Sequence, residues 1–205
     1  MTLFLTFITG LVFGRFLKVC IYRIPRQMRI VIRGAGVPRS YPLTEALNAL
    51  GWLMIIQYFG FTAQGIAGIF LFSMSLMITM IDLEHYIIPD SIVLTTLLGG
   101  IVYHAVTPGP GPANLLLGLA VGLAVPFFLA VVSKGGLGGG DVKLSAVMGF
   151  WLGFPGVFYA LFWGALSGSI TGILLMVLKI KKRKDPIPFG PFLTLGFLST
   201  FFCAM

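Results

Sequence analysis

The sequence predicts an all-α protein, a polytopic membrane protein with about eight transmembrane helices, and two properties of its 205 residues predict this class. Hydrophobic residues make up 58% of the chain and charged residues only 10%, and the mean hydropathy is +1.01. A soluble domain of this length has too little interior to bury so much apolar surface. The few charges also divide the chain into long uncharged runs, and a helix needs about 20 such residues to cross a bilayer.

The spans follow from these runs in chain order. Residues 1–22 form one span, whose last turns carry basic side chains that can reach the lipid headgroups. Three longer runs supply two spans each, because proline or glycine turns divide them. These runs are 46–81 with a turn at 58–61, 91–133 with a turn at 107–112, and 144–178 with a turn at 153–156. Residues 186–205 supply the last span.

Basic residues orient these spans in the membrane. With eight spans, all 14 Lys and Arg fall on one face, and the positive-inside rule makes that face cytoplasmic. Both termini are then outside, and residues 23–42 form a short basic cytoplasmic loop. Because the net charge of +8 serves to orient helices, we expect a multi-pass protein of the plasma (inner) membrane and no nucleic-acid partner. The two cysteines lack CxxC spacing, so we expect no metal site.

All six acidic residues also fall on the cytoplasmic face, and two of them lie at the edge of the hydrocarbon. Asp82 ends the third span and Asp141 opens the sixth. An ionisable side chain in this position is costly, which points to function. If packing brings the two carboxyls together, they can share one proton and activate a water, as an aspartic protease dyad does. The alternative is that each is a solvated loop residue near Lys134 or Lys143.

Five glycines between residues 135 and 140 precede Asp141. Glycine can take positive φ and lets an extended chain approach the backbone closely, and peptide-bond hydrolysis needs an extended substrate. Gly138, Gly139 and Gly140 are therefore candidate substrate-binding positions. The segment does not resemble a phosphate-binding loop, because it lacks the GK[ST] ending and no nucleotide-binding domain surrounds it.

Four segments together resemble the type IV prepilin peptidase family of membrane aspartic proteases. Residues 138–143 (GGGDVK) match the family's GxGD motif, and residues 82–90 match its D-x5-IPD motif. Residues 10–25 and 187–193 resemble the family's opening segment and last span. The resemblance implies an endopeptidase that cleaves the basic leader from type IV pilin-like precursors at the cytoplasmic face, with Asp82 and Asp141 as catalytic residues and no cofactor for this step.

Two departures from the family pattern affect what the resemblance implies. Arg15 and Lys18 stand where the family usually has a small polar residue and an amide. The first cytoplasmic loop also lacks the family's longer insert with two CxxC pairs, although residues 40–45 resemble the segment that follows this insert. The insert is associated with S-adenosylmethionine-dependent methylation of the new N-terminus. Methylation, and with it S-adenosylmethionine as a cofactor, is therefore left open for this short form.

Two acidic residues near helix starts are candidate supporting or substrate-binding residues. Glu45 begins the second span, where it is either a partner of the helix dipole, with Thr44 as the N-cap, or a residue near the substrate. Asp90 follows Pro89 at the start of the fourth span, and we expect it to cap that helix.

Two charged residues flank the proposed dyad in sequence. Glu84, with the neighbouring His85, lies two residues after Asp82 and is either an exposed loop residue or part of the site. Lys143, two residues after Asp141, either favours the ionised form of that carboxyl or only neutralises the local charge.

The sequence therefore predicts one membrane-embedded peptidase domain over residues 1–205, with pilin-like precursors and the lipid bilayer as partners. An alternative function is a small proton- or cation-coupled transporter that uses Asp82 and Asp141, because intramembrane acids also mark ion paths. A second alternative is an assembly subunit that keeps the fold without catalysis. The choice among pilus assembly, secretion and DNA uptake, and the oligomeric state, are left open.

Overall fold

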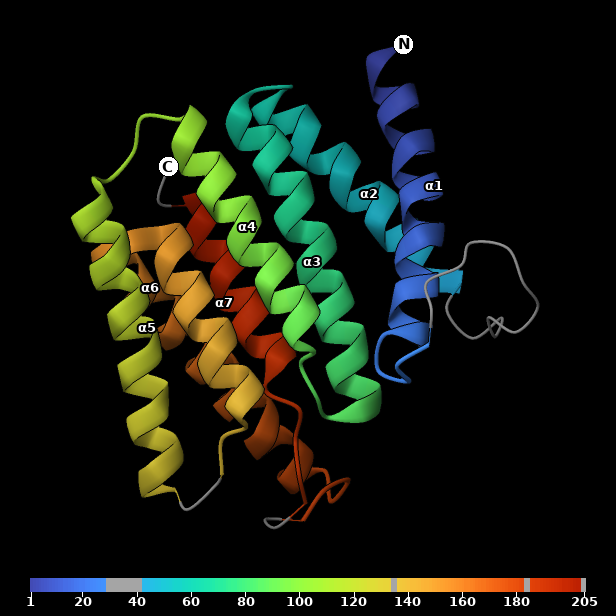
Figure 1. Cartoon of the computed structure of the whole chain (residues 1–205). Helices are drawn as coiled ribbons and strands as arrows, with labels where there is room; N and C mark the ends of the chain where they lie inside the picture. The colour runs from blue at the N-terminus through green and yellow to red at the C-terminus, as the bar shows by residue number, and fades with distance from the viewer. Residues whose placement is uncertain (29–41, 134–135, 183–184, 204–205) are drawn as a thin grey trace. The chain divides into compact units, whose positions relative to one another are not determined.

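The computed structural model describes residues 1–28, 42–133, 136–182 and 185–203. In these ranges it contains seven α-helices and no strand (Figure 1), which confirms the all-α class. The helices are α1 Thr2–Arg23, α2 Pro42–Phe59, α3 Ala63–His85, α4 Asp90–Val106, α5 Pro112–Val132, α6 Gly139–Val177 and α7 Gly190–Cys203.

The first two predicted turns separate helices, as expected. α2 ends at Phe59, and Thr62 caps the start of α3 because its hydroxyl accepts a hydrogen bond from the N–H of Gly65 at 3.1 Å. α4 ends at Val106, and Pro112 opens α5, where its fixed φ suits the first helical position.

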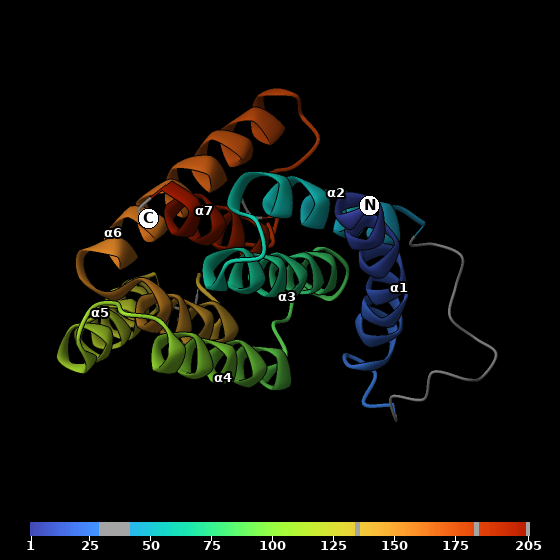
Figure 2. The same cartoon turned by 90° about the horizontal axis from the view of Figure 1, so that it is seen from above.

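The third predicted turn is confirmed as well, because it lies at a bend in α6 that separates two helical halves. Gly153 has φ 63° and ψ −173°, and Phe154 has φ −94° and ψ 135°, so the helical backbone is interrupted at these two residues. A positive φ of this kind favours glycine, which has no Cβ to clash with the backbone. Figure 2 shows the two halves of α6 leaving the bend in different directions.

Several helices are suited to a membrane. Four of the described helices, α1, α3, α5 and α6, are long and apolar enough to cross one, while α4 and α7 are apolar but shorter. Only 22% of the most apolar stretch of α5 is buried, so most of its side chains form an apolar outer surface that suits lipid. The chain thus has several membrane-suited helices, whereas the count of eight spans and the single domain over 1–205 remain predictions.

The chain divides into two compact units, and the first comprises Met1–Pro108. Its core contains a polar junction among three helices, centred on Asn48, which is fully buried. The Asn48 amide donates to the carbonyl of Gly10 in α1 at 2.9 Å and accepts from the hydroxyl of Ser73 in α3 at 2.9 Å. The Trp52 indole N–H donates to the same hydroxyl at 2.9 Å, so this buried network is closed.

The second unit comprises Gly109–Met205, and its α5 packs side by side with the first half of α6 (Figure 1). The two backbones meet at Gly118 and Gly149, where a Cβ on either glycine would overlap the carbonyl oxygen of the other. α7 covers α6 through Trp151, whose ring packs edge-on against Phe197 and Phe201, with centroids 6.4 and 5.9 Å away. This packing supports the first turns of α6, where Asp141 lies.

Candidate active site

Asp82 lies in the last turn of α3 and is buried, with 4% of its surface exposed. The helix ends three residues later, at His85, because the next residue, Tyr86, adopts the left-handed conformation, with φ 56° and ψ 33°. The Tyr86 N–H then donates to the carbonyl of Asp82 at 2.9 Å, which closes the last turn. The carboxyl is therefore held on rigid helix, directly before a turn.

The residues that follow Asp82 lie around this turn. Glu84 is exposed and pairs with the neighbouring His85, whose Nε2 lies 3.6 Å from the Glu84 Oε2. The expectation that Asp90 caps α4 is wrong, because Pro89 occupies the N-cap position and Asp90 is already in the first helical turn. There its negative charge is favourable beside the positive end of the helix dipole.

Asp141 lies in the first turn of α6 and is half-buried. Its Oδ2 accepts a hydrogen bond from the N–H of Gly138 at 3.2 Å, and its own N–H donates to the Gly138 carbonyl at 3.1 Å. Asp141 thereby serves as part of the helix start as well as a candidate acid. This reciprocal pairing fixes the side chain relative to the glycine segment.

The glycines before Asp141 were expected to adopt positive φ, but those that the structure describes do not. Gly138 is extended, with φ −71° and ψ 147°, and Gly139 and Gly140 belong to the first turn of α6. Gly138 and Gly139 are exposed, and a Cβ on Gly139 would meet nothing within 4 Å. What these positions provide is open space beside the backbone rather than an unusual conformation. Gly135 lies outside the described residues.

Two further residues of α6 lie close to Asp141 in sequence. Lys143 is exposed. Ser145 is fully buried and lies one turn after Asp141, hence on the same helix face. Ser145 is not among the residues predicted from the sequence, although its spacing of four residues from Asp141 would have indicated it.

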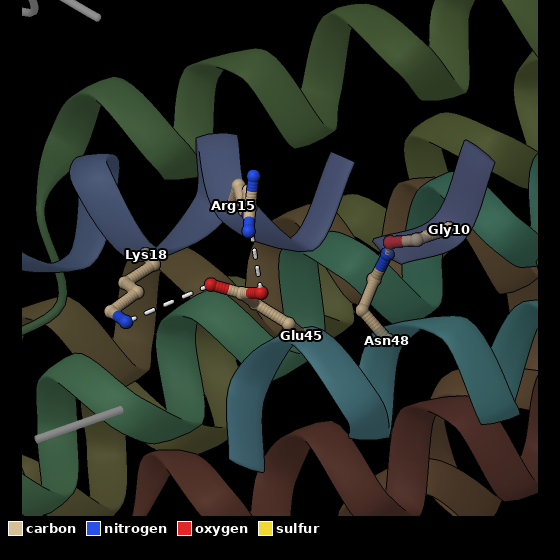
Figure 3. A network of polar contacts seen from close by, with 5 residues as sticks. All are labelled: Gly10, Arg15, Lys18, Glu45 and Asn48. Carbon is tan, nitrogen blue, oxygen red and sulfur yellow. Dashed lines mark hydrogen bonds and ion pairs between the residues drawn. The ribbon is translucent and has the colours of Figure 1, made fainter. Parts of the chain in front are cut away.

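Glu45 connects α2 to α1 through two ion pairs (Figure 3). Its carboxylate lies 3.5 Å from Arg15 Nε and 3.7 Å from Lys18 Nζ. Thr44 is not the N-cap as expected, because α2 already begins at Pro42. Glu45 is in the first turn, as the helix-dipole interpretation requires, and the two residues that depart from the family pattern are its partners.

Several predicted features fall outside the described residues. They are most of the basic loop over 23–42, including Arg29, Arg33 and Arg39, together with Lys134, Arg183 and Lys184. Among the residues that are described, no group of three or more His, Cys, Asp or Glu side chains is placed to hold a metal ion.

Each unit contributes one of the two principal acids. The first unit brings Asp82, Glu84 and Asp90 to the two helix ends that flank a single turn. The second unit places Asp141 directly after the open glycine segment and one turn before Ser145. Each acid thus lies beside backbone that is not enclosed in regular helix.

Comparison with known proteins gives a family match. Residues 69–173 match the model of the type IV leader peptidase family, a range that contains both Asp82 and Asp141. No solved structure matches the chain.

Curated relatives extend the similarity over most of the chain. A prepilin leader peptidase/N-methyltransferase of Xanthomonas campestris pv. campestris is 32% identical over 190 residues, covering 87% of this chain and 66% of the relative. Proteins of the same name from Aeromonas salmonicida and Pseudomonas aeruginosa are each 31% identical over 167 residues and 79% of this chain. The chain spans 57% and 58% of their lengths.

Proposed function

The chain belongs to the type IV leader peptidase family, and from this premise we propose that it is a membrane aspartic endopeptidase. Its substrates are type IV pilin-like precursors, and it removes their basic leader at the cytoplasmic face of the plasma membrane. The observation that carries the proposal is the family match over residues 69–173, which contains both acids predicted from the sequence.

The local surroundings of the two acids support this proposal. Asp82 is 4% exposed at the end of an apolar helix. An ionisable side chain is costly there, and its presence therefore points to a function. Asp141 opens another apolar helix beside Gly139, where the backbone is unobstructed and an extended peptide can approach. These are the two requirements of a peptidase that works at a membrane surface.

The proposed mechanism requires the carboxyls of Asp82 and Asp141 to meet and share one proton, since like charges at close range do not both ionise easily. The ionised carboxyl takes a proton from a water while the protonated one donates to the oxygen of the scissile carbonyl. The water oxygen bonds to the carbonyl carbon and forms a tetrahedral intermediate. The C–N bond then breaks, and the leaving nitrogen receives a proton from the pair. The two groups titrate as one unit.

The proposed membrane arrangement has eight spans, counting the two halves of α6 separately. Basic residues at one end of helices support it: Arg23 lies in the last turn of α1, and Lys179, Lys181 and Lys182 follow α6. A precursor whose hydrophobic helix lies in the bilayer then presents its leader junction at the cytoplasmic face. Residues 1–205 act as one peptidase domain in this arrangement.

N-methylation of the new N-terminus is a second candidate activity, because the curated relatives are named as N-methyltransferases as well as peptidases. The two described cavities of the second unit are lined by apolar and hydroxyl side chains without an acid or a base. These cavities do not fit S-adenosylmethionine, whose ribose and amino acid need several polar partners. The peptidase step needs no cofactor. No observation favours the transporter alternative.

The test is cleavage of a pilin precursor in membranes, in which the mass of the precursor is measured for wild type, Asp82→Asn and Asp141→Asn. The wild type should remove the leader, and each variant should lose at least about a thousandfold in rate, since half of the acid–base pair is missing. Asp185→Asn is the matched control, because among the described residues the Asp185 carboxylate makes a local contact, accepting from the N–H of Lys182 in the turn after α6. Mass also reports any added methyl group.

Each result decides between the functions. If both variants insert, fold and cleave normally, the aspartic mechanism is wrong. If the wild type itself leaves the precursor intact while both variants abolish ion flux, the transporter replaces the peptidase.

A further inference from the structure

A cavity of about 450 Å³ lies within the second unit, beside the segment that carries Asp141. Gly136 and Leu137, which lead into that segment, line one side of it, and Ser145 of α6 lines another. The second half of α6 contributes Leu161 and Ala165. The cavity therefore extends the candidate active site from the glycine segment into the unit, and its volume is in the range of a ligand pocket.

The walls of this cavity are almost entirely hydrocarbon. The lining residues that the structure describes carry no charge, and Ser133 and Ser145 supply the hydroxyl groups. The Ser133 hydroxyl is engaged locally, because it donates to the Ala130 carbonyl at 3.3 Å and accepts from the Gly136 N–H at 3.1 Å. The cavity thus suits an apolar group that has at most one polar atom near Ser145.

The Ser145 hydroxyl is fully buried and has no hydrogen-bond partner among the described residues. Several other helical hydroxyls donate to a carbonyl of their own helix, as Thr96 does to Ile92 at 2.8 Å and Ser167 to Gly164 at 3.1 Å. A buried donor without an acceptor is unfavourable. A ligand that brings an acceptor into the cavity would remove this penalty.

We propose that this cavity is the subsite for an apolar side chain of the substrate next to the bond that is cut, and that Ser145 donates a hydrogen bond to the substrate backbone there. The inference rests on the proposed function. A lipid acyl chain would fill the apolar walls but offers the hydroxyl no acceptor, whereas a peptide supplies a carbonyl beside each side chain. Continuity with the Asp141 segment also favours a peptide.

The size of the cavity can be changed without disturbing a packed core. Ala165 lines the cavity and is exposed, so the larger side chain of Ala165→Phe fills part of the cavity without displacing buried core residues. Ala120→Phe is the matched control, because Ala120 is exposed on α5 and does not line the cavity. Ala165→Leu is a milder variant if the phenylalanine prevents folding.

The substrate is a pilin-like precursor that the wild type cleaves, with each residue on both sides of the scissile bond changed singly to alanine and to phenylalanine. Ala165→Phe should lower kcat/KM for the parent precursor roughly tenfold or more. At one position of the precursor, replacing a large side chain by alanine should remove the defect, so that the Ala165→Phe enzyme and the wild-type enzyme cleave that altered precursor at the same rate. That position identifies the side chain that enters the cavity.

The hydroxyl is tested separately with Ser145→Ala and Ser145→Thr. Ser145→Ala should lower kcat/KM roughly threefold to tenfold on every substrate of the panel, because a backbone contact does not depend on side-chain size. Ser145→Thr keeps the hydroxyl and should restore most of the rate. Ser167→Ala, which removes a hydroxyl bonded within its own helix, should change nothing.

The outcomes separate this inference from the proposed function. A wild type that cleaves no precursor refutes the proposed function and with it the subsite. If the wild type cleaves but Ala165→Phe matches Ala120→Phe, or slows all substrates equally whatever their side chains, the cavity is not a substrate subsite. If Ser145→Ala cleaves at the wild-type rate, the hydroxyl does not hold the substrate.

Discussion

Asn114 of α5 and Phe154 of α6 are joined by a closed pair of hydrogen bonds. The Asn114 Nδ2 donates to the Phe154 carbonyl at 2.9 Å, and its Oδ1 accepts from the Phe154 N–H at 2.8 Å. These backbone groups lie at the bend of α6, where the helix itself leaves them without partners. The Asn114 side chain thus replaces the helical hydrogen bonds that are lost at the bend.

Replacing this amide should destabilise the second unit. Asn114→Ala removes both hydrogen bonds at the bend. Because Phe154 is exposed, each bond contributes about 0.5–1.5 kcal/mol net, so the total loss should be about 1–3 kcal/mol. Thermal unfolding in detergent measures the loss. Gln57→Ala, which removes an exposed amide from α2, should leave the unfolding temperature unchanged. Equal unfolding temperatures for Asn114→Ala and wild type would contradict a role of this pair in holding the bend.

The crossing of α5 and α6 should be equally sensitive to added volume. A methyl group on Gly149 would overlap the carbonyl oxygen of Gly118, and neither backbone can move without shifting its helix. Gly149→Ala should therefore cost about 1–3 kcal/mol despite the better helix propensity of alanine. The control is Gly172→Ala in the same helix, where the added methyl meets only Ile187 at 3.5 Å. A Gly149→Ala protein as stable as the control would contradict the close approach.

The helix boundaries were predictable because they depend on local chemistry. Proline and glycine end or bend helices wherever they occur, and the predicted turns at 58–61 and 107–112 separate helices for this reason. The turn at 153–156 is confirmed for the same reason, because the helical backbone is interrupted at Gly153 and Phe154. The contacts that hold this turn were not predictable, because Asn114, which supplies the hydrogen bonds to Phe154, lies 40 residues away in the sequence.

The candidate site was predictable in its acids and less so in their surroundings. Asp82 and Asp141 stand out because charges are rare at the edges of apolar runs. The N-caps expected at Thr44 and Asp90 were wrong, since α2 already begins at Pro42 and α4 begins at Asp90 itself, directly after Pro89. The burial of Ser145 follows from packing within the second unit, which no local pattern encodes.

The ion pairs of Glu45 distinguish its two interpretations. Its partners lie at 3.5 and 3.7 Å, but the Arg15 side chain is 79% exposed, so solvent screens that pair strongly. A double-mutant cycle of Glu45→Gln with Lys18→Met, followed by unfolding, should give a coupling energy of about 0.2–1 kcal/mol. The cycle with Arg15→Met should give less. If Glu45→Gln lowers the cleavage rate by far more than it lowers the fraction of folded protein, the result would instead favour a position of Glu45 near the substrate.

Gly139 gives the most direct test of the glycine segment. It is exposed, it begins α6, and a Cβ there meets nothing within 4 Å, so a larger side chain costs the fold nothing sterically. If the substrate backbone passes over this position to reach Asp141, Gly139→Leu occupies the space that it needs. Cleavage should then fall roughly a hundredfold, because small displacements of a reacting group are costly, while the unfolding temperature stays within about a degree or two of wild type.

Gly111→Leu is the matched control for this substitution. Gly111 is also exposed, also precedes or opens a helix, and also has open space around its Cβ, but it lies at the start of α5, away from the acids in sequence. Its cleavage rate should stay close to wild type. If Gly139→Leu cleaves as fast as Gly111→Leu, the substrate does not approach over the start of α6. The glycine at 139 would then be unrelated to catalysis, and the subsite beside Ser145 would need an approach from another side.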